Sequence, residues 1–333
     1  MEIPRLPVLL AAFCAVFVCL CGAAFPQTPI PEKGPIPDDR GFQPTDPARV
    51  AKVKVIARHI QGQTYVIAGA GGNVVVQAGD DGILLADTNF TVLYDQILPL
   101  IRQISNKPIR YVMNTHPHGD HTQNNENFAK QGAIVIGHPN LRKTMIEAST
   151  KGPASGPGAN PKGGFPVITT TTPITLYFNG EEIVFMPLKP AHTDADMAVY
   201  FKKSDVFVFG DVYRTDYPSI GDVEGATVYS FLDDYQMALD MTTPNTIFVP
   251  GHGQLSTRQD LSDLREVVVQ LYSRFKDMVA RGMTLEQIME ARPSKEWDAR
   301  FSSESKSATT GNTVQRVYTR MYAAAKKELA AKQ

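Results

Sequence analysis

Short apolar runs and longer amphipathic stretches alternate along the chain from residue 53 onward. Runs rich in Val, Ile and aromatic residues, bounded by glycine or another turn signal, are typical of β-strands. They occupy residues 53–60, 63–69, 73–79, 83–88, 110–115, 133–137, 174–178, 182–188, 197–202, 205–210 and 246–250. Stretches whose apolar positions recur with helical spacing predict helices. These stretches cover residues 91–104, 122–132, 140–149, 230–241, 259–279 and 315–331.

Strands and helices alternate in both halves of this region, and a cluster of hairpins opens each half. That order predicts two β-sheets packed together with helices outside them. We therefore expect one mixed α/β domain over residues 49–333, with helices prevailing from about residue 256. Asn140 is predicted to cap the helix that it begins.

The N-terminal segment has a different composition. After MEIPR, residues 6–25 are apolar and uncharged, and small residues stand at Gly22, Ala23 and Ala24. This pattern predicts a secretory signal over residues 1–24 that is cleaved near Ala24, and hence a periplasmic or secreted protein. The apolar run is also long enough for a membrane anchor, which is the alternative.

Two segments are rich in turn-forming residues. Residues 25–48 contain seven prolines and predict an extended linker before the domain. Residues 151–166, KGPASGPGANPKGGFP, predict a projecting loop, and a loop of this length often covers a site.

Charge and cysteine content narrow the function. The formal net charge is −1, so nothing in the overall charge favours nucleic acid, and we expect a small-molecule substrate. All three cysteines lie before residue 22. The mature domain therefore has neither a disulfide nor a thiolate that could bind a metal.

Residues 114–125, NTHPHGDHTQNN, hold three of the seven histidines and an aspartate. Neutral imidazoles and a carboxylate are the donors that a borderline-soft divalent metal prefers. His116 and His118 follow a predicted strand, and residues two apart in an extended chain point to the same side. Asp120 and His121 then face another direction and could serve a second ion. This spacing alone would also fit a site with one metal.

Three further candidate ligands each follow a predicted strand: His192 in PAHTDAD, Asp211 in GDVYR and His252 in PGHG. Loops at strand ends often converge on a site in α/β folds. The two remaining histidines, His59 and His138, lie outside these turns, and we expect His138 to be structural.

The motifs H-x-H-x-D-H, A-H-T, G-D and P-G-H-G, in this order, resemble those of the metallo-β-lactamase superfamily over about residues 53–255. The resemblance implies an αββα sandwich and an enzyme that binds two zinc ions per chain. It implies that His116, His118 and His192 bind one ion, that Asp120, His121 and His252 bind the other, and that Asp211 bridges both. Asp87 would support the site from behind the ligands.

Two departures refine this resemblance. The chain lacks the cysteine ligand of one β-lactamase subclass, and the Asp211 bridge is similar to that of glyoxalase II, lactonases and general hydrolases. Asp120 and His121 also differ from the H-x-E-x-D pattern of diiron flavoproteins. A ligand set of nitrogen and oxygen atoms favours zinc but also accepts iron or manganese.

The resemblance implies an exported metallo-hydrolase that uses a metal-bound hydroxide to cleave an acyl C–N or C–O bond, β-lactams included. Asp120 would orient the nucleophile. Arg214, three residues after Asp211, would bind a substrate carboxylate, unless it is a rim charge or pairs with Asp216. The alternatives are a glyoxalase II-type thioester hydrolase, a lactonase, and a zinc-holding periplasmic protein without turnover. The full ligand set favours an enzyme.

Overall fold

The structure is a computed structural model that describes residues 30, 34–37, 47–151, 163–302 and 314–331. The predicted signal peptide, most of the predicted linker and most of the predicted loop at residues 151–166 lie outside the described residues. Among the residues that are described, no helix combines the length and the apolar character needed to cross a bilayer.

The first sheet has seven strands in the spatial order β1 to β7. They are β1 (Ile56–Gln61), β2 (Thr64–Ala68), β3 (Val74–Gly79), β4 (Gly82–Ala86), β5 (Ile109–Met113), β6 (Ile134–Gly137) and β7 (Ile168–Thr169). β1 to β4 pair antiparallel as a meander, whereas β4 to β7 pair parallel.

The second sheet has five strands in the spatial order β12-β11-β10-β9-β8. They are β8 (Ile174–Phe178), β9 (Glu181–Pro187), β10 (Met197–Phe201), β11 (Val206–Gly210) and β12 (Ile247–Pro250). β8 to β11 pair antiparallel, and β12 joins β11 in parallel.

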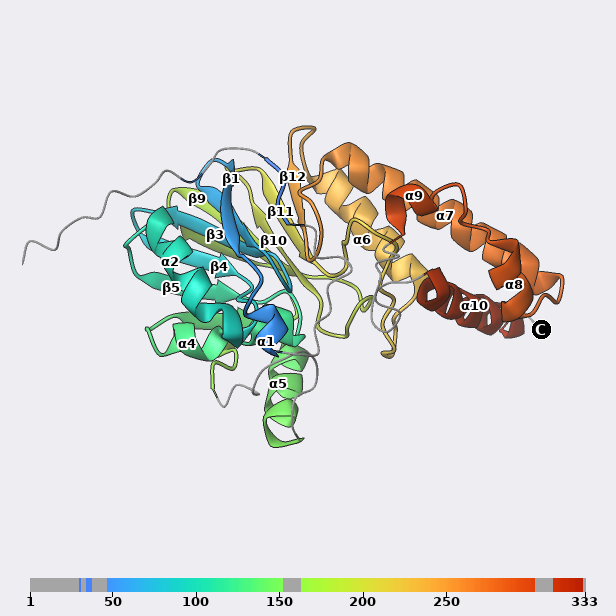
Figure 1. The fold of residues 1–333 in the computed structure, drawn as a ribbon, viewed down its shortest axis with the longest axis horizontal. Helices are drawn as coiled ribbons and strands as arrows, with labels where there is room; N and C mark the ends of the chain where they lie inside the picture. Colours follow the sequence, from blue (N-terminus) through green and yellow to red (C-terminus); the bar gives the residue numbers. More distant parts are fainter. Residues whose placement is uncertain (1–29, 31–33, 38–46, 152–162, 303–313, 332–333) are drawn as a thin grey trace, which may run out of the picture.

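The helices are α1 (Pro47–Val50), the 3₁₀ turn η1 (Thr91–Leu93), α2 (Tyr94–Ile104), α3 (Gly119–Thr122), α4 (Asn125–Ala129), α5 (Pro139–Lys151), α6 (Val228–Met241), α7 (Arg258–Ala280), α8 (Leu285–Ala291), α9 (Asp298–Phe301) and α10 (Val314–Ala330). In Figure 1, α2 and α4 lie on one side of the paired sheets, and α6 and α7 lie on the other. The expected αββα sandwich with a helical C-terminal extension is confirmed.

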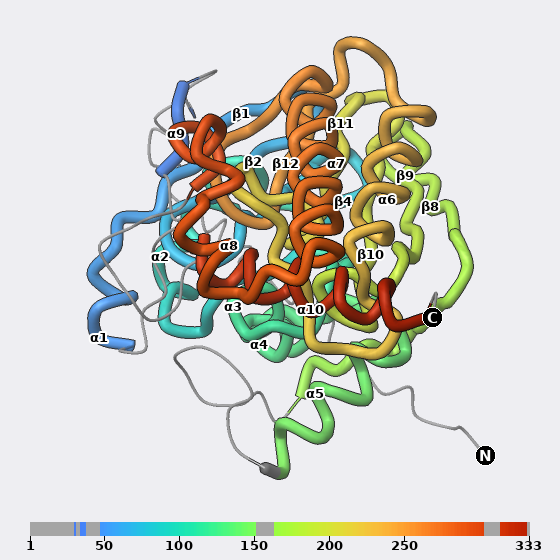
Figure 2. Tube along the Cα trace, turned by 90° about the vertical axis from the view of Figure 1, so that its right-hand side faces the viewer, coloured from blue at the N-terminus to red at the C-terminus, as the bar shows by residue number. Residues whose placement is uncertain are grey.

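Three apolar layers hold the sandwich together. Leu84 of the first sheet packs with Phe185 and Val199 of the second in the layer between the sheets. The outer face of the first sheet packs on α2. A third cluster joins the outer face of the second sheet to α6, α7 and α10. Figure 2 shows α7 and α10 on this side of the molecule. The C-terminal helices thus share a continuous apolar core with the second sheet.

Some local expectations are wrong. The helix predicted over 122–132 is shorter than expected: α3 ends at Thr122, residues 123–124 form a turn, and the helix is limited to α4. The Asn124 side chain fixes this turn, because it donates to the carbonyl oxygens of Thr88 and Phe90, both at 2.8 Å. The helix predicted to begin at Asn140 begins at Pro139, a residue type well suited to the first helical turn. The sequence also did not predict β7, α8 or α9.

Candidate metal centre

The predicted ligands lie just beyond the ends of four strands. The histidine-rich segment follows β5 of the first sheet, whereas His192, Asp211 and His252 follow β9, β11 and β12 of the second. β5 ends at Met113, so both histidines lie beyond the expected strand: His116 lies in a bend, and His118 has an extended backbone just before α3. The candidate site therefore forms where the two sheets meet, and both sheets contribute ligands.

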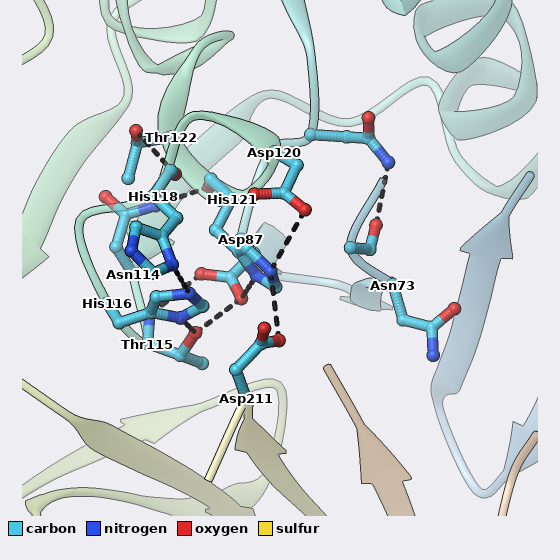
Figure 3. A network of polar contacts seen from close by, with 12 residues as sticks. Asn73, Asp87, Asn114, Thr115, His116, His118, Asp120, His121, Thr122 and Asp211 are labelled. Carbon is cyan, nitrogen blue, oxygen red and sulfur yellow. Dashed lines mark hydrogen bonds and ion pairs between the residues drawn. The ribbon is translucent and has the colours of Figure 1, made fainter. Parts of the chain in front are cut away.

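Three histidines form the first ligand set. Nδ1 of His118 lies 3.1 Å from Nε2 of His116 and 2.9 Å from Nε2 of His192. Figure 3 shows the rings of His116 and His118 side by side. Two nitrogens bound to one tetrahedral zinc at 2.0–2.1 Å lie about 3.3 Å apart, so these three atoms have nearly the required spacing.

The histidines of the first set have lowered pKa values, which favours the binding of a cation. Burial is the largest cause that lowers the pKa of His116, and the neighbouring His121 lowers it further. Burial likewise lowers the pKa of His118, and it lowers that of His192 to about 3. The three imidazoles are therefore neutral near pH 7, which is the form that binds metal.

The second ligand set surrounds Asp120. Nε2 of His252 lies 3.2 Å from Oδ2 of Asp120, and Nε2 of His121 lies 3.8 Å from the same oxygen. Burial raises the pKa of Asp120, but the charge of His121 and the hydrogen bond from His252 outweigh it, so the net shift is downward. The side chain of Asp120 is 22% exposed, whereas those of His121 and His252 are 0% and 6% exposed. Asp120 thus faces the open side of the site.

Asp211 lies between the two sets. Its Oδ1 is 3.3 Å from Nε2 of His121 and 3.4 Å from Nε2 of His252, while its Oδ2 is 3.5 Å from Nε2 of His192. Burial raises the pKa of Asp211, but His252 and His121 hold it well below its usual value. An ionised carboxylate with one oxygen toward each set can bridge two cations.

The buried polar atoms provide a test of whether the site fits metal. Nε2 of His121 and Oδ1 of Asp211 are buried and have no hydrogen-bond partner among the described residues. Leaving such atoms unsatisfied costs about 1–3 kcal/mol each. The candidate ligand atoms form two groups, each within 4.8 Å: His116, His118, His192 and Asp211, and Asp120, His121 and His252. The residues present therefore fit a pair of divalent metal ions.

Asp87 orients His121. Its Oδ2 accepts a 2.7 Å hydrogen bond from Nδ1 of His121, so Nε2 of that ring faces the ligand set (Figure 3). The carboxylate also accepts hydrogen bonds from the backbone N–H and hydroxyl of Thr115, at 2.8 and 2.7 Å. Asp87 has a φ of 64°, a left-handed conformation that is uncommon for a non-glycine residue. Burial lowers the pKa of His121, but Asp120, Asp87 and Asp211 raise it to about 10.

His192 is oriented by two groups. Its Nδ1 donates to the carbonyl oxygen of Ser219 at 2.9 Å, which leaves the Nε2 lone pair toward the other ligands. Asp196 accepts hydrogen bonds from the backbone N–H groups of His192 and Thr193, at 2.8 and 2.9 Å, and so holds the turn. The sequence alone assigns no clear role to Asp196 within PAHTDAD and holds no signal for Ser219, whose contribution is a backbone carbonyl.

Two glycines that sequence reasoning missed allow close packing at the ligands. A Cβ atom at Gly72 would lie 2.2 Å from Cε1 of His121, and one at Gly251 would lie 2.0 Å from Oδ1 of Asp211. Any other residue at either position would displace a ligand. Gly251 is part of the P-G-H-G motif and Gly72 precedes a predicted strand, but the sequence does not indicate which side chain either glycine approaches.

Arg214 lies behind Asp211 and is only 4% exposed. Its Nη1 donates to Oδ2 of Asp211 at 3.2 Å, and its Nε donates to Oδ1 of the buried Asp216 at 3.1 Å. The alternative that Arg214 pairs with Asp216 is therefore observed, together with a pair to Asp211. His59 and His138 belong to neither ligand group, and Nδ1 of His138 accepts from the backbone N–H of Asn140.

The two-sheet sandwich brings these donors together in one candidate metal site. The sequence profile of the metallo-β-lactamase superfamily matches residues 58–252, so the chain belongs to that superfamily. It is an enzyme with a candidate site for divalent metal. No curated protein matches the chain in sequence.

Three solved structures illustrate the shared fold. A stereoselective inverting sec-alkylsulfatase from Pseudomonas sp. aligns with a TM-score of 0.58 and 17% identity over 82% of this chain and 50% of its own. The DIM-1 metallo-β-lactamase has a TM-score of 0.53 and 17% identity, and covers 66% of this chain and 99% of its own. A metallo-β-lactamase from Pontibacter korlensis has a TM-score of 0.50 and 18% identity, over 65% and 99%. This chain spans about half the length of the alkylsulfatase.

Proposed function

We propose that the chain is a dinuclear zinc-dependent hydrolase that cleaves an acyl C–N or C–O bond, with β-lactams among its candidate substrates. The position of Asp211, with one oxygen toward each ligand set, is the observation that carries this proposal. Two zinc ions bound in this way would lower the pKa of a shared water to near 7 and polarise the scissile carbonyl. The all-nitrogen and oxygen donor set also accepts iron or manganese.

The side chains around the site would bind the metals, orient the attacking water and fix the ligand geometry. His116, His118 and His192 are neutral and need lose no proton to bind metal near pH 7. Asp120 is the ligand in the second set that reaches toward solvent, so it is placed to accept a hydrogen bond from the attacking water and to orient it. Asp87 fixes the ring of His121.

Cations near the site favour a substrate that carries an anionic group. The sequence-based hypothesis assigns this recognition to Arg214, whose guanidinium contacts Asp211. Arg316, in the first turns of α10, supplies a second cation. The Arg316 side chain is exposed, but the nearby protein displaces part of its hydration. This desolvation and the positive charges of Arg320 and Arg214 lower the pKa of Arg316, while Asp211 acts in the opposite direction. Arg316 therefore lies within electrostatic reach of the metal centre.

Metal analysis and a substrate panel test the proposal. After zinc loading and dialysis, we expect about two zinc ions per chain, because each ligand set fits one ion. The panel comprises nitrocefin, a lactone, a thioester, a phosphodiester and a secondary alkyl sulfate, the last because the alkylsulfatase likeness extends over 82% of this chain. Chelator-sensitive hydrolysis of nitrocefin or the lactone would support the proposal. Preference for the thioester would support the glyoxalase II-type alternative, and preference for the sulfate ester would contradict acyl cleavage.

We also propose that the protein is exported to the periplasm or beyond. The support is the apolar, uncharged segment at residues 6–25, which ends in the small residues Gly22, Ala23 and Ala24. Expression of the full chain, fractionation and N-terminal sequencing test this proposal. A mature N-terminus near residue 25 in the periplasmic or secreted fraction is expected. An intact N-terminus in the membrane fraction would instead show an anchor.

A further inference from the structure

The segment from Asp211 to Asp222 determines the geometry of more than one ligand. It begins at the carboxylate shared by both sets, and its Ser219 carbonyl oxygen accepts the hydrogen bond from Nδ1 of His192. A backbone hydrogen bond from Gly221 to the carbonyl oxygen of Ala191 fixes the segment to the turn that carries His192. A shift of this segment would therefore move Asp211 and rotate His192.

Tyr217 lies near the middle of this segment and is fully buried. Its backbone N–H donates to the carbonyl oxygen of Phe301 at 2.9 Å. Its hydroxyl donates to Oδ1 of Asp298 at 2.9 Å and approaches the carbonyl oxygen of Ser294 at 3.3 Å. Burial raises the pKa of Tyr217, so the hydroxyl keeps its proton and remains a donor.

The partners of Tyr217 belong to α9 and to the turn before it, in the C-terminal extension. In Figure 1, α9 lies nearer the sandwich than α8 does. Asp298 is itself held, because its Oδ1 accepts from the Ser294 hydroxyl at 2.6 Å and its Oδ2 pairs with Arg292 at 3.0 Å. Tyr217 thus reaches an acceptor whose position is fixed by other bonds.

A second contact joins the same segment to the extension. Nη1 of Arg320, on α10, lies 3.0 Å from Oδ1 of Asp222. Asp222 is 85% exposed, and an exposed ion pair of this kind contributes little. The buried Tyr217 contact, with both its backbone and its hydroxyl engaged, is the stronger of the two.

We propose that Tyr217 is a positioning residue through which the C-terminal helices orient Asp211 and His192 for metal binding. This inference rests on the proposed metal site but not on any particular substrate. It assigns the helical extension a role in the metal centre, in addition to its role in the apolar core.

A matched pair of tyrosine variants provides the test. Tyr217→Phe keeps the ring and removes the hydroxyl. Tyr200→Phe removes another buried tyrosine hydroxyl, on β10, which bonds Asp205 and touches neither the segment that carries Asp211 nor α9. The measurements are thermal unfolding of the metal-free full chain, zinc affinity by chelator competition, and the visible absorption spectrum of the cobalt-substituted protein.

We expect both substitutions to lower the unfolding temperature, because each removes one buried hydrogen bond. We expect only Tyr217→Phe to weaken zinc affinity, by about tenfold, which is typical when a group that orients a ligand is lost. We also expect only this variant to change the cobalt spectrum. If Tyr217→Phe matches Tyr200→Phe in zinc affinity and cobalt spectrum, the proposal is overturned and Tyr217 is a packing residue.

Asp298→Ala removes the partner of the Tyr217 hydroxyl on α9. It also provides the test if Tyr217→Phe does not fold. It should reproduce the loss of zinc affinity without altering the segment itself. In the double variant the two losses should not add, because both remove one interaction. Fully additive losses would contradict the coupling. A wild-type chain that binds zinc but hydrolyses none of the panel would refute the proposed function alone, and a chain that binds no metal would refute both.

Discussion

Oδ1 of Asp211 lies 3.3 Å from Nε2 of His121, and both atoms are buried without a hydrogen-bond partner in the described part of the chain. Each atom alone would be costly to bury. A cation that contacts both would satisfy them together. Since Oδ2 of the same carboxylate faces His192, a change at Asp211 should affect both ligand sets rather than one.

The first prediction is therefore that Asp211→Ala loses affinity for both metal ions. Activity should fall by orders of magnitude, because removal of the carboxylate leaves each set short of one donor. Zinc content after dialysis and kcat/KM on the best panel substrate provide the measurement. Asp194→Ala, at an exposed aspartate that bonds Asn140, is the control and should retain both metals. Two tightly bound zinc ions in Asp211→Ala, with full activity, would refute the bridging role.

The second prediction is that Asp120→Asn keeps the fold but loses turnover. The amide has nearly the same shape as the carboxylate, so circular dichroism should be unchanged. It lacks the negative charge that faces His252 and His121, and it is a weaker acceptor for the attacking water. The measurement is kcat at saturating substrate with the zinc content checked. A rate within a few-fold of wild type would show that Asp120 does not orient the nucleophile.

The convergence of the candidate ligands could be predicted from the sequence, because each stands in a short motif after a strand. His192, Asp211 and His252 come from distant parts of the chain, yet the rule that strand ends converge brings them to one edge. The assignment of Asp87 depended on the resemblance, since one aspartate after a strand carries little information by itself. The structure adds its 2.7 Å hydrogen bond to His121.

Other features depend on packing that a single sequence does not encode locally. Ser219 acts through its carbonyl oxygen, which every residue type has. Tyr217 and Asp298 are 81 residues apart, and no spacing rule connects them. The helix predicted over 122–132 begins only at Asn125, because Asn124 lies in a turn whose side chain bonds the carbonyl oxygen of Thr88, 36 residues earlier in the chain.

The third prediction concerns the protons released when zinc binds. In the metal-free chain the pKa of His192 is lowered to about 3, whereas that of His121 is raised to about 10. At pH 7 zinc therefore displaces no proton from His192 but must displace one from His121. Binding of zinc by the second set should release about one proton from this residue, and its affinity should rise with pH up to about 10.

Titration calorimetry in buffers of different ionisation enthalpy measures this release. The sign follows from the direction of the shift: a histidine with a raised pKa holds its proton more firmly, so low pH opposes metal binding. Zinc binding to the first set should depend little on pH near neutrality. Equal pH dependence for both ions, or no proton release, would contradict the charge assignment of His121.

The fourth prediction separates the two arginines near the site. Arg214 is buried and bonded to Asp211 and Asp216, so Arg214→Ala should lower kcat/KM for neutral and anionic substrates alike. Arg316 is exposed and lies within electrostatic reach of Asp211. Arg316→Ala should raise KM for an anionic substrate by about tenfold, from the loss of about 1.5 kcal/mol of charged hydrogen bonding, with little effect on a neutral one.

KM and kcat for one anionic and one neutral substrate, measured in wild type and both variants, decide between these roles. Lys327→Ala removes an exposed cation from the last turn of the same helix and is the control for overall charge. If Arg214→Ala raises KM about tenfold for the anionic substrate alone, the guanidinium contacts the substrate's carboxylate, as the sequence-based hypothesis states. If Arg316→Ala changes KM for the anionic substrate no more than Lys327→Ala does, then Arg316 does not contact the substrate's charge. Any remaining effect would come from long-range attraction, which salt screens.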